Sequence, residues 1–223
     1  MSRKILVIAP HPDDETLGCG GTILRHISKG DVVYWLIVTT ISEKTGYDKN
    51  LVHKRKKEIK KINKHYGFKE LFELNYPPSE LDAVPLKKII HSFSKIINNI
   101  KPHTIYAPYF ADIHSDHRVV CEAILSCVKS FRSNYVKKVL CYETISETEF
   151  NLKGREYSFR PNCWINIEKF LKKKIQIIKI YKSELLDHPF PRSEKNINSL
   201  ASIRGSNVGL KSAESFMILK DIS

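Results

Sequence analysis

Two clusters of acidic and histidine side chains stand far apart in this 223-residue chain. The first is Pro10-His11-Pro12-Asp13-Asp14-Glu15, and the second is Asp112-Ile113-His114-Ser115-Asp116-His117-Arg118. Three consecutive carboxylates repel one another, so the first cluster needs a physical reason. A helix N-terminus accounts for one or two of them, because acidic residues suit the helix dipole and cap its N–H groups. It does not account for the neighbouring histidine.

Each cluster follows an apolar run that predicts a buried strand. Residues 5–8 precede the first cluster and residues 104–107 precede the second. Continuous apolar runs are typical of parallel strands buried on both faces, and ligands bind at the carboxyl ends of such strands. We therefore expect the two clusters to meet at one edge of a sheet. His114 and His117 are three residues apart, so one helical turn can present both on one side.

These residue types are typical of a metal site. Two histidines and one carboxylate with an open position suit catalytic zinc, and the same donors suit non-haem iron. Iron oxygenases generally carry these donors as His-x-Asp on a β-barrel, whereas here His-x-x-Asp follows a buried strand, so hydrolysis is favoured. Because Asp13 and Asp14 are adjacent, they cannot easily point the same way. One of them can bind the metal while the other faces its water.

The remaining sequence alternates between strand and helix patterns, which predicts a Rossmann-like, mostly parallel α/β sheet with helices on both faces. The clearest helix is 86–100, whose apolar residues recur at helical spacing. Gly30 and Gly67 are expected to end the first two helices. Further strands are expected at 32–38, 68–74 and 138–142, and further helices at 16–29, 54–66 and 119–131.

The pattern becomes less regular after about residue 159. We expect a helix over 167–186 and then a loop that contains Pro189, Pro191, Gly205 and Gly209. We interpret 159–223 as a C-terminal extension of one domain, 1–223, that shapes the mouth of the pocket.

The composition is that of an ordinary globular protein, with 42% hydrophobic and 27% charged residues, which disfavours disorder and coiled coil. The net charge of +13 is compatible with an anionic partner, but a bias towards Lys, Ile and Asn explains it more simply. Nucleic-acid binding is not expected, because the basic segment 54–64 fits the solvated face of an amphipathic helix.

Cysteine usage and the N-terminus bear on the compartment. The chain has five cysteines and no C-x-x-C pair, which favours reduced core residues over a disulfide framework. The sequence has no signal-peptide pattern and no run near the ~18 apolar residues of a membrane span. A cytoplasmic protein is expected, and homo-oligomerisation stays open.

The two clusters also resemble a known family. They are similar to the motifs of the LmbE/PIG-L family of zinc-dependent amino-sugar N-deacetylases, usually Ala/Gly-His-Pro/Ala-Asp-Asp-Glu with a later His-x-Asp-His. Pro10 replaces the small residue of the first motif. The resemblance covers nearly the whole chain and includes Arg55-Lys56-Lys57-Glu58, Lys101-Pro102, Tyr142-Glu143, Pro161-Asn162, Tyr181-x-Ser183-Glu184 and Ala213-Glu214-x-Phe216.

The resemblance implies a role for each matching residue. His11, Asp14 and His117 would hold zinc, with Fe²⁺ as another possible metal. Asp13 would be the general base, and His114, in its protonated form, would stabilise the developing oxyanion together with zinc. Arg55 would help to hold the substrate. Asp116 would orient a metal-bound histidine or, equally, cap a helix.

The implied reaction is removal of an acetyl group from an N-acetylated amino sugar or its conjugate. Two alternatives stay open: an amidase or esterase with the same metal site and a non-sugar substrate, and a non-enzymatic Rossmann-type binding module. The binding module should carry a glycine fingerprint directly after the first strand. Gly18, Gly20 and Gly21 come too late for that fingerprint.

Two arginines, Arg192 and Arg204, stand near prolines and glycines in a segment expected to be a loop. Their guanidinium groups are well suited to bind phosphate oxygens. Together with Arg55 they predict an anionic substrate, namely a nucleotide- or phosphate-linked N-acetyl amino sugar. The alternative is that Arg192 and Arg204 form structural salt bridges, for instance with Glu184 or Glu214.

Overall fold

The computed structural model describes residues 2–152 and 154–223, and these residues form a seven-stranded sheet in the order β3-β2-β1-β4-β5-β7-β6. The strands from β3 to β5 are parallel, whereas β7 pairs antiparallel with both β5 and β6. The strands are β1 (Lys4–Ala9), β2 (Val32–Thr39), β3 (Glu70–Tyr76), β4 (Thr104–Pro108), β5 (Lys138–Tyr142), β6 (Cys163–Asn166) and β7 (Ala213–Asp221).

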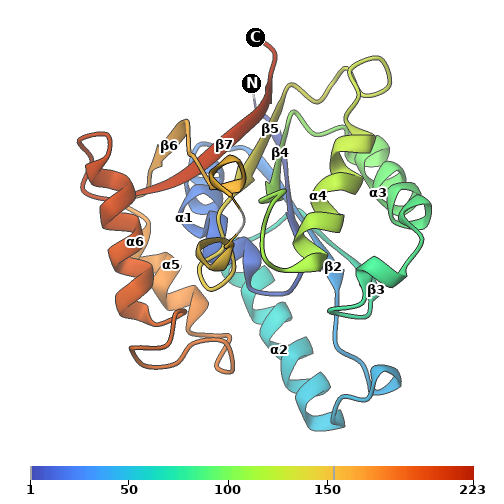
Figure 1. The fold of residues 1–223 in the computed structure, drawn as a ribbon, viewed down its shortest axis with the longest axis horizontal. Coiled ribbons are helices and arrows are strands. Elements are labelled where there is room, and N and C mark those ends of the chain that lie inside the picture. The colour runs from blue at the N-terminus through green and yellow to red at the C-terminus, as the bar shows by residue number, and fades with distance from the viewer. Residues whose placement is uncertain (1, 153) are drawn as a thin grey trace.

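Helices cover both faces of the sheet, as predicted (Figure 1). Successive side chains of β1 point to opposite faces, so Leu6 and Ile8 enter the core under α3 and α4, while Ile5 and Val7 enter the core under α1, α2 and α5. No helix among the described residues is long and apolar enough to cross a membrane. The α-helices are α1 (Asp14–Ser28), α2 (Lys49–Tyr66), α3 (Leu86–Ile100), α4 (Ser115–Cys127), α5 (Leu171–Ile178) and α6 (Glu194–Ser206).

The sheet order brings the two acidic clusters together. β1 and β4 are hydrogen-bonded neighbours and run in the same direction, so the turn after β1 and the loop after β4 open at the same edge. The chain winds from β1 towards β3 on one side and continues from β4 on the other, so this edge is a topological switch point. Ligands bind at such points in open α/β sheets.

Several element boundaries differ from the sequence-based prediction. The helix expected at 119–131 is α4, which lies at 115–127, because the polar residues of the second cluster form its first turn. The helix expected at 54–66 starts earlier, at Lys49, where the Asp48 side chain accepts the N–H groups of Asn50 and Leu51. The helix expected at 167–186 is the much shorter α5, which ends at Ile178.

The prediction of a loop up to Gly209 is wrong, because residues 194–206 form α6. Ser193 caps this helix by accepting the N–H of Asn196. Gly205 is a packing residue within the helix and not a loop marker: a Cβ there would lie 2.6 Å from the carbonyl oxygen of Leu210. Strands β6 and β7 were not predicted either, and they place the C-terminal segment in the same sheet as the N-terminal half.

The glycines of α1 serve close packing. A Cβ at Gly18 would overlap the ring of Tyr142, and a Cβ at Gly21 would overlap the side chain of Ile167. The whole first half of α1 is buried. These contacts explain the glycines without any phosphate ligand, which agrees with their position outside the glycine fingerprint of a nucleotide-binding module.

A buried ion pair fastens α1 to the C-terminal segment. Lys174 of α5 and Glu214 of β7 lie 2.7 Å apart, and each side chain is 5% exposed. Glu214 also accepts the N–H groups of Gly21 and Thr22, and Lys174 donates to the carbonyl oxygen of Leu17. The pair therefore compensates for its burial with hydrogen bonds to the helix backbone.

We expect Lys174→Met to lower the free energy of unfolding by about 3–5 kcal/mol, because it leaves the Glu214 carboxylate buried without its cation. Adding Glu214→Gln should recover part of this loss, since a neutral amide oxygen still accepts a backbone N–H. Urea denaturation measures both values. Lys179→Met removes an exposed pair with Glu194 and should cost less than about 1 kcal/mol. If Lys174→Met and Lys179→Met lowered the free energy of unfolding equally, the prediction would be contradicted.

Candidate metal centre

The turn after β1 holds Asp13 in a strained conformation that separates it from Asp14. Asp13 has φ 136° and ψ −30°, a region that residues other than glycine rarely adopt. Glu15 stabilises the turn by accepting the N–H of Asp13 at 3.1 Å, and Thr39 donates both its N–H and its hydroxyl to the carbonyl of Pro10. Glu15 is completely buried, which raises its pKa to about 8, and it faces Thr16 and Tyr181. Glu15 is therefore a structural residue of the turn.

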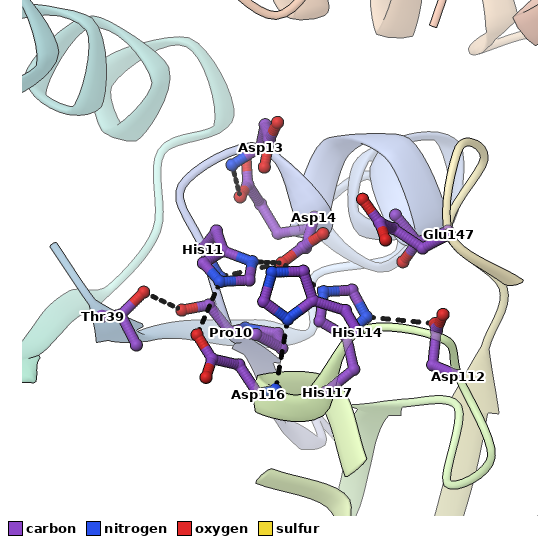
Figure 2. A network of polar contacts seen from close by, with 12 residues as sticks. Pro10, His11, Asp13, Asp14, Thr39, Asp112, His114, Asp116, His117 and Glu147 are labelled. Atoms are coloured by element: carbon purple, nitrogen blue, oxygen red, sulfur yellow. Dashed lines mark hydrogen bonds and ion pairs between the residues drawn. The ribbon is translucent and has the colours of Figure 1, made fainter. Parts of the chain in front are cut away.

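Three side chains converge at the edge of the sheet (Figure 2). The Asp14 Oδ2 atom lies 3.3 Å from Nδ1 of His11 and 3.3 Å from Nε2 of His117. Such a carboxylate and two histidines form a group whose ligand atoms all lie within 4.8 Å of one another. His11 and Asp14 come from the turn after β1, and His117 comes from the first turn of α4.

Each of the two histidines contacts a second carboxylate through the ring nitrogen that faces away from Asp14. His11 Nε2 lies 2.9 Å from Asp116 Oδ2, and His117 Nδ1 lies 3.1 Å from Asp112 Oδ2. Histidines that bind metals almost always have such partners, which fix the tautomer and the ring orientation. The structure thus brings Asp116 to His11, and its alternative role as a helix cap is wrong. The residue that caps α4 is His114, whose Nδ1 accepts the N–H of Asp116.

Asp112 is a site residue that the sequence analysis did not assign. It is fully buried and accepts the hydroxyl of Thr148 at 3.0 Å in addition to its contact with His117. Its presence in the second cluster was the only signal in the sequence. Nothing in its spacing distinguishes it from a residue of the loop after β4.

The carboxylates make this centre strongly attractive to cations. Burial favours the neutral form of His11, but hydrogen bonds to Asp116 and Asp14 outweigh it and raise its pKa to about 9. Burial likewise opposes the charge on His117, but Asp14 and Asp112 raise its pKa to about 10. The two histidines in turn hold the pKa of Asp14 well below its ordinary value against the effect of burial. The negative potential that retains protons here also favours a metal cation.

The residues present fit a divalent metal ion. Asp14 Oδ1 and His117 Nε2 are buried, and neither makes a hydrogen bond among the described residues, since the 3.3 Å contact of Nε2 with Asp14 Oδ2 lacks hydrogen-bond geometry. Buried polar atoms normally have partners, so two unsatisfied atoms in one centre indicate a ligand. A second group, His11, His114 and Asp116, is less suitable, because the Asp116 oxygens already accept the N–H groups of Ser79 and Leu81.

A cavity of about 320 Å³ opens beside this centre. Asp13 reaches it, and burial raises the pKa of Asp13 to about 7, although the Arg192 guanidinium acts in the opposite direction. The residues that line the cavity are His11, Pro12, Asp13, Thr39, Thr40, Ile41, Tyr47, Leu51, Arg55, Pro78, Ser79, His114, Glu147, Ser183, Glu184 and Arg192.

Two of the three arginines expected to bind substrate lie in this cavity, and both are paired with carboxylates. Arg192 donates to Asp13 at 2.7 Å, to Glu147 at 3.1 Å and to Glu184 at 3.2 Å. Arg55 donates to the other oxygen of Glu184 and to the carbonyl of Pro12. Glu184 thus joins the two guanidinium groups, and each of these groups also donates to the turn that carries Asp13.

The structure does not bring Arg204 to the site. Its guanidinium forms two hydrogen bonds with Glu143, at 2.8 Å and 2.6 Å, and it does not line the cavity. Arg204 lies on α6, a helix that the sequence analysis took for a loop. The expectation that it binds substrate is corrected to a structural salt bridge, with Glu143 as the partner.

His114 lines the cavity as a neutral hydrogen-bond donor. Burial and the neighbouring His11 and His117 lower its pKa to about 4. Since its Nδ1 accepts the N–H of Asp116, the hydrogen of the neutral ring is on Nε2. This low pKa favours a neutral imidazole that donates through Nε2 over the protonated form, and the role of His114 at the oxyanion stays a prediction.

The fold and the site together define a Rossmann-like α/β protein with a candidate His–Asp–His metal centre at the switch point of its sheet. The chain belongs to the PIG-L family of GlcNAc-PI de-N-acetylases, which matches residues 6–128. The diacetylchitobiose deacetylase of Thermococcus kodakarensis is 24% identical to this chain over 99% of it and 84% of the relative. Both the family and this relative are named as deacetylases, and deacetylases are hydrolases.

Solved structures share the fold. The N,N'-diacetylchitobiose deacetylase from Pyrococcus horikoshii, complexed with an inhibitor, has a TM-score of 0.77 at 23% identity, covering 98% of this chain and 84% of that one. GalB, the 4-carboxy-2-hydroxymuconate hydratase from Pseudomonas putida, has a TM-score of 0.71 at 15% identity, covering 99% and 98%. A deacetylase and a hydratase thus have the same fold, so the function of this chain must be argued from its site.

Proposed function

We propose that this chain is a zinc-dependent N-deacetylase that removes the acetyl group from an N-acetylated amino sugar or its conjugate. The observation that carries the proposal is the convergence of His11, Asp14 and His117 beside a separate carboxylate, Asp13, at one cavity. Membership of a deacetylase family supports the reaction type. The same donors also suit Fe²⁺, so the choice of zinc rests on the hydrolytic reaction.

His11, Asp14 and His117 would hold the metal, and Asp116 and Asp112 would keep the two imidazoles in the required orientation. A divalent metal bound there supplies Lewis-acid chemistry, because it acidifies water and polarises the amide carbonyl. The strained turn keeps the Asp13 carboxylate apart from these donors, so that it is available for proton transfer.

Asp13 accepts the proton of the water that attacks the carbonyl carbon. The Nε2–H of His114 donates a hydrogen bond to the oxygen that becomes negative as the tetrahedral centre forms. Protonated Asp13 then returns the proton to the amine nitrogen as the C–N bond breaks, which leaves the free amine and acetic acid, and the acid loses its remaining proton to solvent. Arg192 positions the Asp13 carboxylate throughout, through their contact of 2.7 Å.

The charges of the cavity favour a neutral substrate. Asp13, Glu147 and Glu184 line it together with two arginines, and those arginines are already paired with these carboxylates. A phosphate group would have to displace Glu184 or lie beside it, and juxtaposed like charges cost several kcal/mol. The expectation of a nucleotide- or phosphate-linked sugar is thereby replaced by that of a neutral N-acetyl amino sugar or neutral conjugate.

The proposed function is tested by release of primary amine from N-acetylated compounds after zinc loading. We expect kcat/KM for N-acetylglucosamine or its β-linked disaccharide to exceed that for the nucleotide diphosphate conjugate by about tenfold or more, the equivalent of ~1.4 kcal/mol. Glu184→Gln should lower this ratio of kcat/KM values, because it removes the negative charge that pairs with both Arg55 and Arg192. Glu194→Gln removes an equal charge from outside the cavity and should leave the ratio unchanged.

Two outcomes would contradict the proposal. Amine release from N-acetyl amino acids but from no sugar would indicate an amidase with a non-sugar substrate. A preference for the nucleotide conjugate that Glu184→Gln does not change would contradict the argument from cavity charge.

A further inference from the structure

A second cavity lies at the opposite edge of the sheet. Its volume is about 360 Å³, and it is lined by residues at or next to the starts of β1, β4 and β5, by the second half of α1 and by β6 and β7. The metal centre is at the carboxyl ends of the same parallel strands. Since β1 has six residues, its two ends lie roughly 17 Å apart at about 3.3 Å per residue.

The charged groups that line this cavity are basic. Arg3, Arg25, Lys29 and Lys138 line it, and no Asp or Glu is among its lining residues in the described part of the chain. Two carboxylates lie nearby: Asp31, which accepts the N–H of Arg3 and pairs with His26, and Asp221, which pairs with Lys138. The position of Arg25 and Lys29 at the C-terminal end of α1 suits the helix dipole, but the dipole does not explain Arg3 and Lys138.

Two residues that line this cavity each carry a buried hydrogen-bond donor without a partner among the described residues. Thr22 is one of them: it is 1% exposed, and its Oγ1 makes no hydrogen bond. Trp164 also lines the cavity, and its buried Nε1 is likewise without a partner. A buried polar group without a partner is costly, so native structures rarely keep two of them in one place without a ligand. An indole N–H can only donate, and a hydroxyl can donate, so both suit an acceptor.

The rest of the lining is largely apolar. Tyr106, Leu140 and Ile218 come from three adjacent strands of the sheet, and their side chains lie beside the basic groups. An inorganic anion would leave this surface uncovered. A ligand with a ring or hydrocarbon body and an anionic group would use both parts of the cavity.

We propose that this cavity is a second binding site, distinct from the metal centre, for a small organic phosphate with a ring-shaped body. The phosphate oxygens accept hydrogen bonds from the arginines and from Thr22 and Trp164, since charge-assisted bonds to phosphate are strong and directional. The ring contacts Tyr106, Leu140 and Ile218. This charge pattern is opposite to that of the catalytic cavity, so the two sites select different ligands.

Phenyl phosphate is a suitable probe, with phenol and inorganic phosphate as its two halves. The chain has two tryptophans, so the indole N–H of Trp164 gives one of two signals in a ¹H–¹⁵N spectrum, assigned by its loss in Trp164→Phe. We expect a saturable shift of that signal with phenyl phosphate in the zinc-loaded protein. Each half of the probe should bind about tenfold more weakly or worse.

Three variants locate the binding. Arg3→Gln combined with Lys29→Gln should weaken phenyl phosphate about tenfold, whereas Lys60→Gln combined with Lys61→Gln, an equal charge loss on the exposed side of α2, should not. Thr22→Val removes only the unpartnered hydroxyl, so it should leave the unfolding free energy unchanged or higher. It should nevertheless lower the affinity for phenyl phosphate about three- to tenfold, as expected for one lost hydrogen bond.

The proposal is overturned if phenyl phosphate gives no saturable shift of the Trp164 signal. It is also overturned if the two double variants weaken binding equally, because the effect would then come from net charge alone. Equal affinity for phenol would indicate an apolar pocket without an anion site, and equal affinity for inorganic phosphate would contradict the contribution of the ring.

Discussion

His11→Ala, Asp14→Ala and His117→Ala should each remove most of the bound metal from a protein that otherwise holds about one divalent ion per chain. A catalytic zinc site has only three protein donors, so the loss of one leaves a weak two-donor site. Elemental analysis of the four purified proteins gives the metal content, and competition with a chromophoric chelator gives the affinities. We expect affinity to fall by more than the ~10–100-fold that is typical for the loss of an outer carboxylate.

The controls separate a local effect from a general one. Asp116→Asn and Asp112→Asn should lower the affinity by ~10–100-fold while leaving a measurable site, because each removes the partner of one histidine. His91→Ala and Asp221→Ala remove an exposed histidine and an exposed aspartate away from the centre and should have no effect. Metal content like that of the wild type in all three donor variants would show that the ligands have been assigned wrongly.

Asp13→Asn should retain the metal but lose turnover by roughly a hundredfold or more, the usual contribution of a general base. Asparagine has nearly the same shape, tolerates the positive φ of residue 13 and can still accept a hydrogen bond from Arg192, but it cannot take a proton. Metal content and kcat/KM should be measured on the same preparations. The turn and the metal centre should both survive this change, so the loss would be assigned to proton transfer.

Two further variants make this result specific. His114→Ala should also keep the metal and lower kcat by about a hundredfold, because it removes a donor to the developing oxyanion. Glu147→Gln changes a carboxylate that lines the same cavity without a role in proton transfer, and it should have a much smaller effect. If Asp13→Asn were nearly as active as the wild type with its metal bound, another residue would have to be the base.

Local patterns in the sequence were sufficient for the N-terminal two thirds of the fold. The helix at 86–100 and the strand at 138–142 were predicted with the bounds that the structure has, because apolar residues at regular spacing leave one way to bury them. The C-terminal third lacks that regularity. Helix α6 buries only Ile197, Ala201 and Gly205, so no apolar stripe marks it. Its stability depends on packing against residues distant in sequence.

The sequence by itself determined the kinds of donor in the site and their place at the ends of two strands. It did so because parallel neighbours present their carboxyl ends at one edge, wherever the strands lie in the chain. It also identified the family through the motif 10–15 and the later histidines.

Only the tertiary structure decided which atoms meet. It turned Asp13 away from Asp14, placed Asp112 on His117 and paired Arg204 with Glu143 outside the cavity. It also surrounded Arg192 with carboxylates, which is the reason for proposing a neutral substrate in place of the anionic one predicted from the sequence. The physical reason is that electrostatic and hydrogen-bond partners act over a few ångströms of space, and these partners come from segments that no local pattern in the sequence relates.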